Sequence, residues 1–183
     1  MKVIQKYFLA IVPTGEIQQA AAALKMELKA KLNIKYALKS PAHITLKMPF
    51  NYNEAKEKVL IETLENFLST KKSLKIKVGG TDKFGKRVIF WKVQADSSLT
   101  ELQTDLKTFC KRELNLVDEL SDRNYHPHMT IAFKDVKERD FDEAKALIQK
   151  SDINQLLEVC SVELLKRLDG KWVVIQSLKM ASD

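Results

Sequence analysis

The pattern of apolar and polar residues divides the chain into two similar halves. Residues 7–12 and 87–93 are apolar runs of the kind that form strands, and each is followed by a short polar turn. Apolar residues then recur at helical spacing in both halves, which predicts helices over residues 15–31 and 98–114. Each half therefore begins with a strand followed by a helix.

The rest of each half continues this correspondence. A loop follows each helix, at residues 33–42 and 115–127, and leads into a further strand. The elements predicted after that strand are helices over residues 53–68 and 140–149 and strands over residues 73–78 and 159–168. This shared order indicates an internal duplication, with approximate repeats 1–80 and 86–180 in a single domain of residues 1–183. A duplication of this kind predicts a pseudo-two-fold axis, which would set equivalent residues face to face.

The same four-residue motif begins the strand after each loop. It reads His-Ile-Thr-Leu at residues 43–46 and His-Met-Thr-Ile at residues 128–131, 85 positions later. Side chains alternate between the two faces of a strand, so each histidine shares a face with its threonine, roughly 7 Å away. If the axis brings the copies together, two imidazoles and two hydroxyls face one small space, a set that suits an oxyanion ester. The candidate catalytic residues are therefore His43, Thr45, His128 and Thr130.

Composition limits the class of protein but does not identify a ligand. The 183 residues include 31 Lys and Arg against 24 Asp and Glu, a formal charge of +7 that favours anionic partners such as nucleotides or RNA ends. No stretch approaches the roughly 18 to 20 apolar residues needed to cross a bilayer. The apolar run near the start is short and is broken by Pro13, so it predicts a first strand rather than a signal peptide. We expect a cytoplasmic monomer without a membrane segment.

The third histidine raises the question of a metal. In His126-Pro127-His128 the two histidines are two residues apart, a spacing that occurs in metal sites. No Asp, Glu or Cys accompanies them in the motif, and two neutral ligands alone make a poor divalent site, so we expect neither a metal nor a cofactor. Pro127 marks the entrance of the strand, which makes His126 a residue of the site's rim.

The motifs resemble those of the 2H phosphoesterase superfamily, which is named for two His-x-Thr/Ser motifs. Residues 40–50 (Ser-Pro-Ala-His-Ile-Thr-Leu-Lys-Met-Pro-Phe) are similar to its first motif, and residues 125–132 (Tyr-His-Pro-His-Met-Thr-Ile-Ala) to its second. The nearest branch by this resemblance is the bacterial 2′-5′ RNA ligases, also called RNA 2′,3′-cyclic phosphodiesterases. The resemblance covers nearly the whole chain. It implies a bilobal α+β fold with pseudo-two-fold symmetry, antiparallel sheets lining a central cleft, and helices outside.

The resemblance also implies a reaction, the metal-independent hydrolysis of a 2′,3′-cyclic phosphodiester on an RNA end or a small nucleotide. One neutral imidazole would take a proton from the attacking water, and the other, protonated, would give one to the departing 3′ oxygen. Thr45 and Thr130 would donate to the non-bridging oxygens, where negative charge accumulates. The product would be a 2′-phosphate. The pseudo-symmetry leaves open which histidine is the base.

Residues beside the motifs are candidates for holding the substrate. Lys47 follows the first motif and, by strand alternation, shares a face with its histidine and threonine. Phe50 and Tyr125 flank the motifs, where they would stack on a base or simply pack at the rim. Arg123 lies in the loop before the second motif. Together with His126, these residues form the predicted substrate-binding set.

Three other functions stay open at this point. Within the superfamily, the same residues would serve reversible 2′-5′ RNA ligation or the hydrolysis of another cyclic nucleotide. The chain would otherwise be an RNA-binding module whose motifs hold a phosphate and whose turnover is incidental. A metallohydrolase built on His126 and His128 is the third alternative, and it predicts loss of activity with a chelator.

Overall fold

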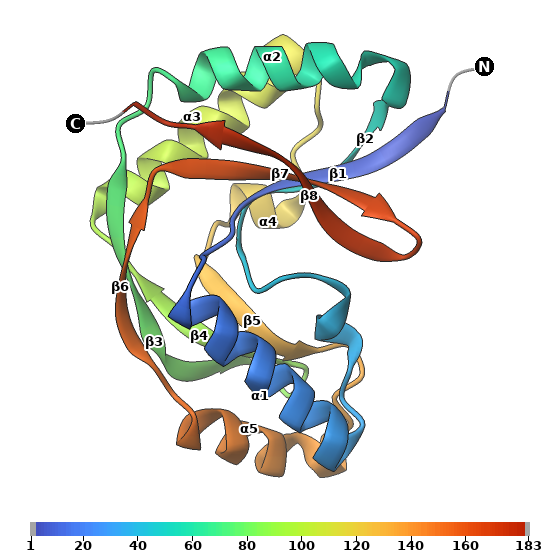
Figure 1. Ribbon diagram of the computed structural model, residues 1–183, viewed down its shortest axis with the longest axis vertical. Helices are drawn as coiled ribbons and strands as arrows, with labels where there is room; N and C mark the ends of the chain where they lie inside the picture. Colours follow the sequence, from blue (N-terminus) through green and yellow to red (C-terminus); the bar gives the residue numbers. More distant parts are fainter. Residues whose placement is uncertain (1–2, 182–183) are drawn as a thin grey trace.

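The computed structural model describes residues 3–181, which contain one continuous antiparallel sheet of eight strands with helices on its outside (Figure 1). The strands are β1 Ile4–Ile11, β2 Ile44–Asn53, β3 Leu74–Phe84, β4 Val88–Gln94, β5 His128–Phe133, β6 Asn154–Val159, β7 Ser161–Leu168 and β8 Lys171–Lys179. The helices are α1 Glu16–Leu32, α2 Glu57–Leu68, α3 Ser97–Leu114, α4 Leu120–Arg123 and α5 Phe141–Lys150, with 3-10 turns η1 Tyr36–Lys39, η2 Glu54–Lys56 and η3 Glu138–Asp140. The predicted α+β fold with antiparallel strands inside and helices outside is confirmed.

The largest difference from the predicted elements lies near the end of the chain. The strand predicted at residues 159–168 is β7, and a strand that was not predicted, β6, precedes it and is separated from it at Cys160. β6 pairs with β3 at one edge of the sheet, whereas β7 pairs with β1 near the other edge. The two strands are separate because the chain crosses here from one half of the sheet to the other.

The strand order β6-β3-β4-β5-β2-β1-β7-β8 forms two halves that meet at a single pair of residues. β2 and β5 are paired only at Ile44 and Met129, each of which follows a motif histidine. The two residues are equivalent in the predicted duplication, so the contact lies where a pseudo-two-fold axis would pass. Each half of the sheet contains strands from both predicted repeats. In one half β3 of the first repeat pairs with β4 of the second, and in the other half β7 of the second repeat pairs with β1 of the first. The halves of the chain therefore interlock by exchanging strands.

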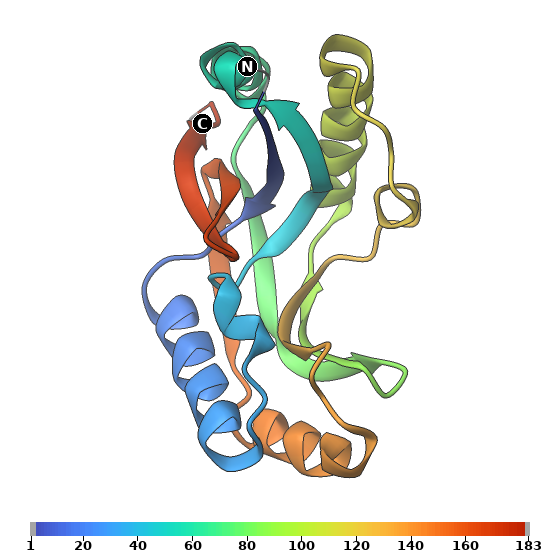
Figure 2. The same ribbon diagram turned by 90° about the vertical axis from the view of Figure 1, so that its right-hand side faces the viewer.

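Two pairs of helices cover the sheet, one at each end of the molecule (Figure 2). α2 and α3 pack on β8 and β2, and the rings of Phe67 and Phe109 stack between them with centroids 4.2 Å apart. α1 and α5 pack against each other and on β5 and β3. Each pair takes one helix from each half of the chain. No helix within residues 3–181 combines the length and the apolar character needed to span a bilayer.

The first helix of each half ends in the same way, just before the loop that leads to a motif. Asn33 after α1 and Asn115 after α3 both have a left-handed backbone, and the amide of each bonds back to a carbonyl of the last turn. Asparagine tolerates this conformation better than most residues with a side chain. The two caps turn the chain out of the helices towards the strands that carry the histidines.

Candidate active site

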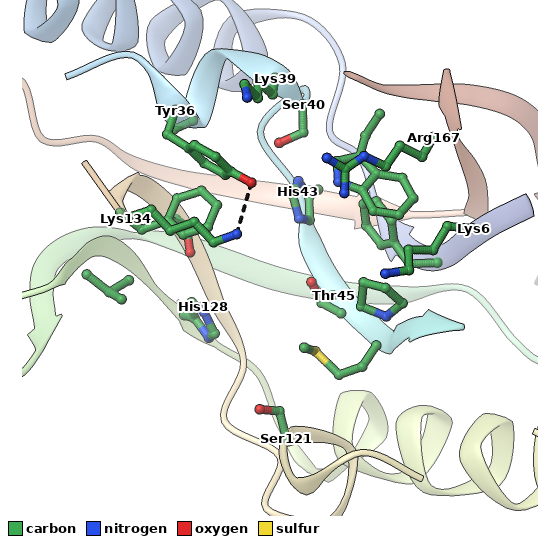
Figure 3. Close-up of a pocket in the computed structure, with 18 of the residues that line it drawn as sticks. Lys6, Tyr36, Lys39, Ser40, His43, Thr45, Ser121, His128, Lys134 and Arg167 are labelled. Atoms are coloured by element: carbon green, nitrogen blue, oxygen red, sulfur yellow. Dashed lines mark hydrogen bonds between the residues drawn. The ribbon is translucent and has the colours of Figure 1, made fainter. Parts of the chain in front are cut away.

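The two motifs line one cavity of about 530 Å³ beside the junction of β2 and β5 (Figure 3). The side chains of His43, Thr45, His128 and Thr130 all contribute to its wall. In the antiparallel pairing of Ile44 with Met129, the residue before one lies across from the residue after the other. The four motif side chains therefore flank this pair and meet in the cavity wall beside it.

The same backbone contact orients each imidazole. Nδ1 of His43 lies 2.7 Å from the carbonyl oxygen of Pro41, and Nδ1 of His128 lies 2.7 Å from that of His126. A carbonyl oxygen only accepts hydrogen bonds, so Nδ1 is the donor in both rings. In the neutral imidazole, Nε2 is then the basic nitrogen available to a ligand.

Burial makes both imidazoles easier to deprotonate. It lowers the pKa of His43 to about 4, against the opposing hydrogen bond to Pro41, and the positive charge of Lys25 lowers it further. Burial also lowers the pKa of His128, again against a hydrogen bond to a carbonyl oxygen. In the absence of an anion, His43 is therefore neutral at pH 7.

Phenylalanines fix the rings from the adjacent strands. Phe8 of β1 contacts His43 with centroids 4.9 Å apart, and Phe90 of β4 contacts His128 at 5.1 Å. Phe84, at the end of β3, contacts His128 edge-on at 5.0 Å. The two motifs thus have matching apolar supports, to which the β3–β4 hairpin adds a third on the His128 side.

The prediction that Lys47 faces the cavity is wrong, because both motif strands contain a bulge just after the threonine. In β2 the register shifts between Thr45 and Lys47, and in β5 it shifts between Thr130 and Ala132. An extra residue reverses the alternation of side chains, so Lys47 points into the core, where it is fully buried. There it donates to the Asp122 carboxylate and, at 2.8 Å, to the carbonyl of Val117. Lys47 is a structural cation that ties the loop before β5 to β2.

The other predicted substrate-binding residues have different positions. Phe50 is buried and stacks on Tyr7 with centroids 6.0 Å apart, so of its two predicted roles the structure favours packing, in the core rather than at the rim. Arg123 is exposed on α4 and is not part of the cavity wall. Tyr125 and His126 line a smaller recess of about 220 Å³, which adjoins the main cavity through shared walls at Thr45 and His128. Only these two remain beside the candidate site.

Five cations that no sequence motif marks also line the main cavity. They are Lys6, Lys25, Lys39, Lys134 and Arg167. They come from β1, α1, η1, the residue after β5, and β7, so no local pattern could have grouped them among 31 Lys and Arg. The described residues of the wall include no Asp or Glu. The cavity therefore attracts anions more strongly than the net charge alone suggests.

Tyr36 connects this basic wall with both motif loops. Nζ of Lys134 donates to its hydroxyl at 2.9 Å, which lowers the pKa of Tyr36 (Figure 3). The Asp135 carboxylate accepts the amides of Lys35 and Tyr36, both at 2.8 Å. Asp135 thus fixes η1, which precedes the first motif, to the end of β5.

α1 holds the backbone next to His43. The Gln18 side chain accepts the amide of Ala42 at 2.8 Å and donates to its carbonyl at 3.0 Å, and Lys25 donates to the carbonyl of Ser40 at 3.2 Å. These contacts fix the two residues on either side of Pro41, whose carbonyl orients the imidazole. The position of His43 therefore depends on a helix some twenty residues earlier in the chain.

His126 and His128 do not form part of a larger set of metal-binding side chains within residues 3–181. No group of three or more His, Cys, Asp or Glu residues gathers there at metal-binding distances. The two rings lie with centroids 6.4 Å apart, and Nδ1 of His128 is occupied by the His126 carbonyl.

The fold and the site define a class of α+β proteins in which two interlocked half-sheets bring a pair of His-x-Thr strands into one basic cavity. Residues 13–171 match the family model described as the 2′-5′ RNA ligase superfamily, and the chain belongs to that superfamily. The resemblance to the 2H phosphoesterases noted from the motifs is thereby confirmed.

Individual relatives cover almost the whole chain. It is 25% identical over 175 residues to a protein of Geobacillus sp. (strain WCH70) provisionally named a phosphoesterase, and the match covers 94% of each chain. Among solved structures, E. coli LigT complexed with 3′-AMP matches with a TM-score of 0.66 at 17% identity. TT0787 of Thermus thermophilus matches with a TM-score of 0.64 at 14% identity. Both matches cover 97% of this chain and 99% of the other, and at such identities they establish the fold.

Proposed function

We propose that this protein hydrolyses a 2′,3′-cyclic phosphodiester on an RNA end or a small nucleotide and leaves a 2′-phosphate. The observation that carries the proposal is one cation-lined cavity that contains two imidazoles with available Nε2 atoms and two threonine hydroxyls. Neither hydroxyl is used in a side-chain hydrogen bond among the described residues. A cyclic diester matches this set, because its hydrolysis removes one proton, adds another and concentrates charge on two non-bridging oxygens.

In the proposed reaction His43 is the base and His128 the acid. Neutral His43 takes a proton from the water that attacks phosphorus, while the bond from phosphorus to O3′ breaks and His128 gives its proton to O3′. The lowered pKa of His43 suits the first role, and the anionic phosphate favours the protonated form of His128 needed for the second. Thr45 and Thr130 donate to the non-bridging oxygens. Solvent then restores both protonation states.

The solved relatives support a ligand that contains phosphate. E. coli LigT has been crystallised with 3′-AMP, with NADP+, with ATP and with phosphate. The basic wall of the cavity in this chain is suited to the same chemical group.

Reversible 2′-5′ ligation is the second candidate, favoured by the description of the superfamily to which the chain belongs. In ligation an RNA 5′-hydroxyl takes the place of water. The same base takes its proton as it attacks phosphorus, the bond from phosphorus to O3′ breaks, and the same acid gives its proton to O3′, which leaves a 2′-5′ diester. Incubation of cyclic-phosphate-ended RNA with a 5′-hydroxyl RNA would give a longer strand only if ligation occurs.

Product analysis in EDTA tests the proposal directly. A nucleoside 2′,3′-cyclic phosphate and a short RNA with the same terminus should both be converted to the 2′-phosphate, with the chelator present throughout. The ratio of the two rates separates a small-nucleotide enzyme from an RNA-end enzyme. Activity that disappears in EDTA and returns with a divalent cation would instead favour a metallohydrolase. No conversion of either compound would exclude the cyclic phosphodiesterase proposal.

The pH dependence of kcat/KM should reflect the lowered pKa values. The base must be neutral, so the acid limb should fall near the pKa of about 4 of His43. The acid must be protonated, so activity should decline as the pH rises through the lowered pKa of His128. We expect a maximum below pH 6.5, the ordinary value for histidine. An optimum well above neutral pH would contradict these assignments.

A further inference from the structure

A recess of about 250 Å³ extends the cavity towards α1. It shares Lys25, Lys39, Ser40 and Trp172 with the main cavity, so the two spaces adjoin. Gln18 of α1 completes this side of the wall and is already engaged by Ala42. The recess therefore extends the space beside His43 along a wall that holds two of the five cavity cations and an indole.

Lys25 is the unusual residue of this recess. It is only 4% exposed, and within residues 3–181 its ammonium has one hydrogen-bond acceptor, the Ser40 carbonyl at 3.2 Å, and no carboxylate partner. Burial lowers the pKa of Lys25 to about 8, because no counter-charge offsets the lost hydration of the ammonium form. A buried ammonium without an anion is unfavourable unless a ligand supplies the missing charge.

The reacting group alone does not account for the charges present. A cyclic phosphodiester has one negative charge, and two threonine hydroxyls and a protonated His128 already face it in the proposed reaction. Five further cations line the cavity, with no Asp or Glu among the described wall residues. This excess of positive charge fits a ligand that has at least one phosphate besides the reacting group.

The extra charge lies mainly on one side of the histidines. In sheet order, β5 with His128 is followed by β2, which begins next to His43, then by β1 with Lys6 and β7 with Arg167. Figure 3 shows Arg167 and Lys6 beyond His43, away from His128. The recess on the His128 side, by contrast, has no Lys or Arg in its described wall and is formed in part by Phe84 and Tyr125. The two ends of the cavity therefore differ in chemistry although the motifs are alike.

We infer that the recess at Lys25 is a second phosphate-binding subsite, which takes a phosphate of the substrate other than the reacting one. The inference rests on the proposed function for the identity of the substrate. Lys25 and Lys39 contact the second phosphate, and the nucleoside extends from His128 towards the aromatic recess. The favoured substrates are then nucleotides with a second phosphate, as in an oligonucleotide end, rather than nucleosides with the cyclic phosphate alone.

A comparison of two ligands in the wild-type protein and two variants, called the binding cycle below, tests this inference without requiring turnover. Calorimetry would compare adenosine 2′-phosphate with adenosine 2′,5′-bisphosphate in the wild-type protein, in Lys25→Met and in Lys29→Met. Hydrogen bonds to a charged group are stronger than those between neutral groups, so the second phosphate should tighten wild-type binding about tenfold or more. Lys25→Met should remove most of that gain, measured as the ratio of the two dissociation constants, so that any weakening common to both ligands cancels.

Lys29→Met is the matched control, because it removes the same charge from the same helix at an exposed position outside the cavity wall. It should retain the gain from the second phosphate. Lys39→Ala, at an exposed position of η1, should reduce the gain and provides a second variant if Lys25→Met does not fold. An equal loss for both ligands in Lys25→Met, or no gain in the wild type, would overturn the inference. Failure of the hydrolysis assay together with a positive binding cycle would refute the proposed reaction alone.

Discussion

Replacing either motif histidine with alanine should reduce turnover of a nucleoside 2′,3′-cyclic phosphate by about 10²–10⁴-fold, the usual contribution of one general acid or base. His43→Ala removes the proposed proton acceptor, and His128→Ala removes the proposed donor to O3′. Both side chains line the cavity and bond only to a carbonyl of their own loop, so the variants should remain folded. Initial rates and circular dichroism would measure the two effects.

A variant of the third histidine and a binding assay distinguish the proposed enzyme from a metallohydrolase and from an RNA-binding module. His126 is exposed and orients His128 through its backbone carbonyl, which His126→Ala retains. This variant should lose far less activity than His128→Ala, whereas a metal site at these two residues requires similar losses. An RNA-binding module with incidental turnover would have little wild-type activity to lose. Nucleotide binding that survives in His43→Ala while turnover disappears would identify a catalytic role.

Replacing Asp122 with alanine should lower the free energy of unfolding by about 3–5 kcal/mol, because it leaves the Lys47 ammonium buried without its anion. The Asp122 carboxylate also accepts the amides of Met48 at 2.8 Å and Glu119 at 3.0 Å, so it joins β2 to α4 and its preceding loop. The carboxylate and the lysine are 2% and 0% exposed, respectively. Urea denaturation followed by tryptophan fluorescence would measure the change.

A neighbouring aspartate provides the control for this prediction. Asp118 lies 3.8 Å from Nζ of Lys47 but is more exposed than Asp122, and Asp118→Ala should have a much smaller effect. The double variant Lys47→Met/Asp122→Leu should recover part of the loss, since it removes the unpaired charge but not the two amide donors. Equal destabilisation by Asp118→Ala and Asp122→Ala would show that the charge of Lys47 is not balanced mainly by Asp122.

The interlocked sheet explains how two similar motifs come to have different surroundings. The single pair of Ile44 and Met129 joins equivalent positions, and both imidazoles are oriented by the carbonyl two residues earlier. The residues beyond this contact come from elements that differ between the two halves of the chain. Lys25 approaches His43, whereas Phe84 approaches His128. Different roles for the two histidines in the proposed reaction follow from these neighbours.

The amino-acid sequence by itself determined the elements and the pairing of chemistry within each motif. Helical and strand periodicities are local properties, so most helices and strands of both halves were predictable, whereas the short elements α4 and β6 were not. Strand alternation likewise sets each histidine on the same face as its threonine. The motif pair also pointed to the superfamily to which the chain belongs.

Only the tertiary structure decided what surrounds the motifs. The bulge that turns Lys47 into the core depends on how β2 pairs with β1, and the pattern of Lys47 and its neighbours does not reveal it. The cations at Lys6, Lys25 and Arg167 meet because three distant segments pack around one cavity. Burial depends on that packing as well, and it is the main cause of the lowered pKa values of the two histidines. Local sequence periodicity specifies which way a side chain leaves its own strand or helix, but long-range packing decides what that side chain meets.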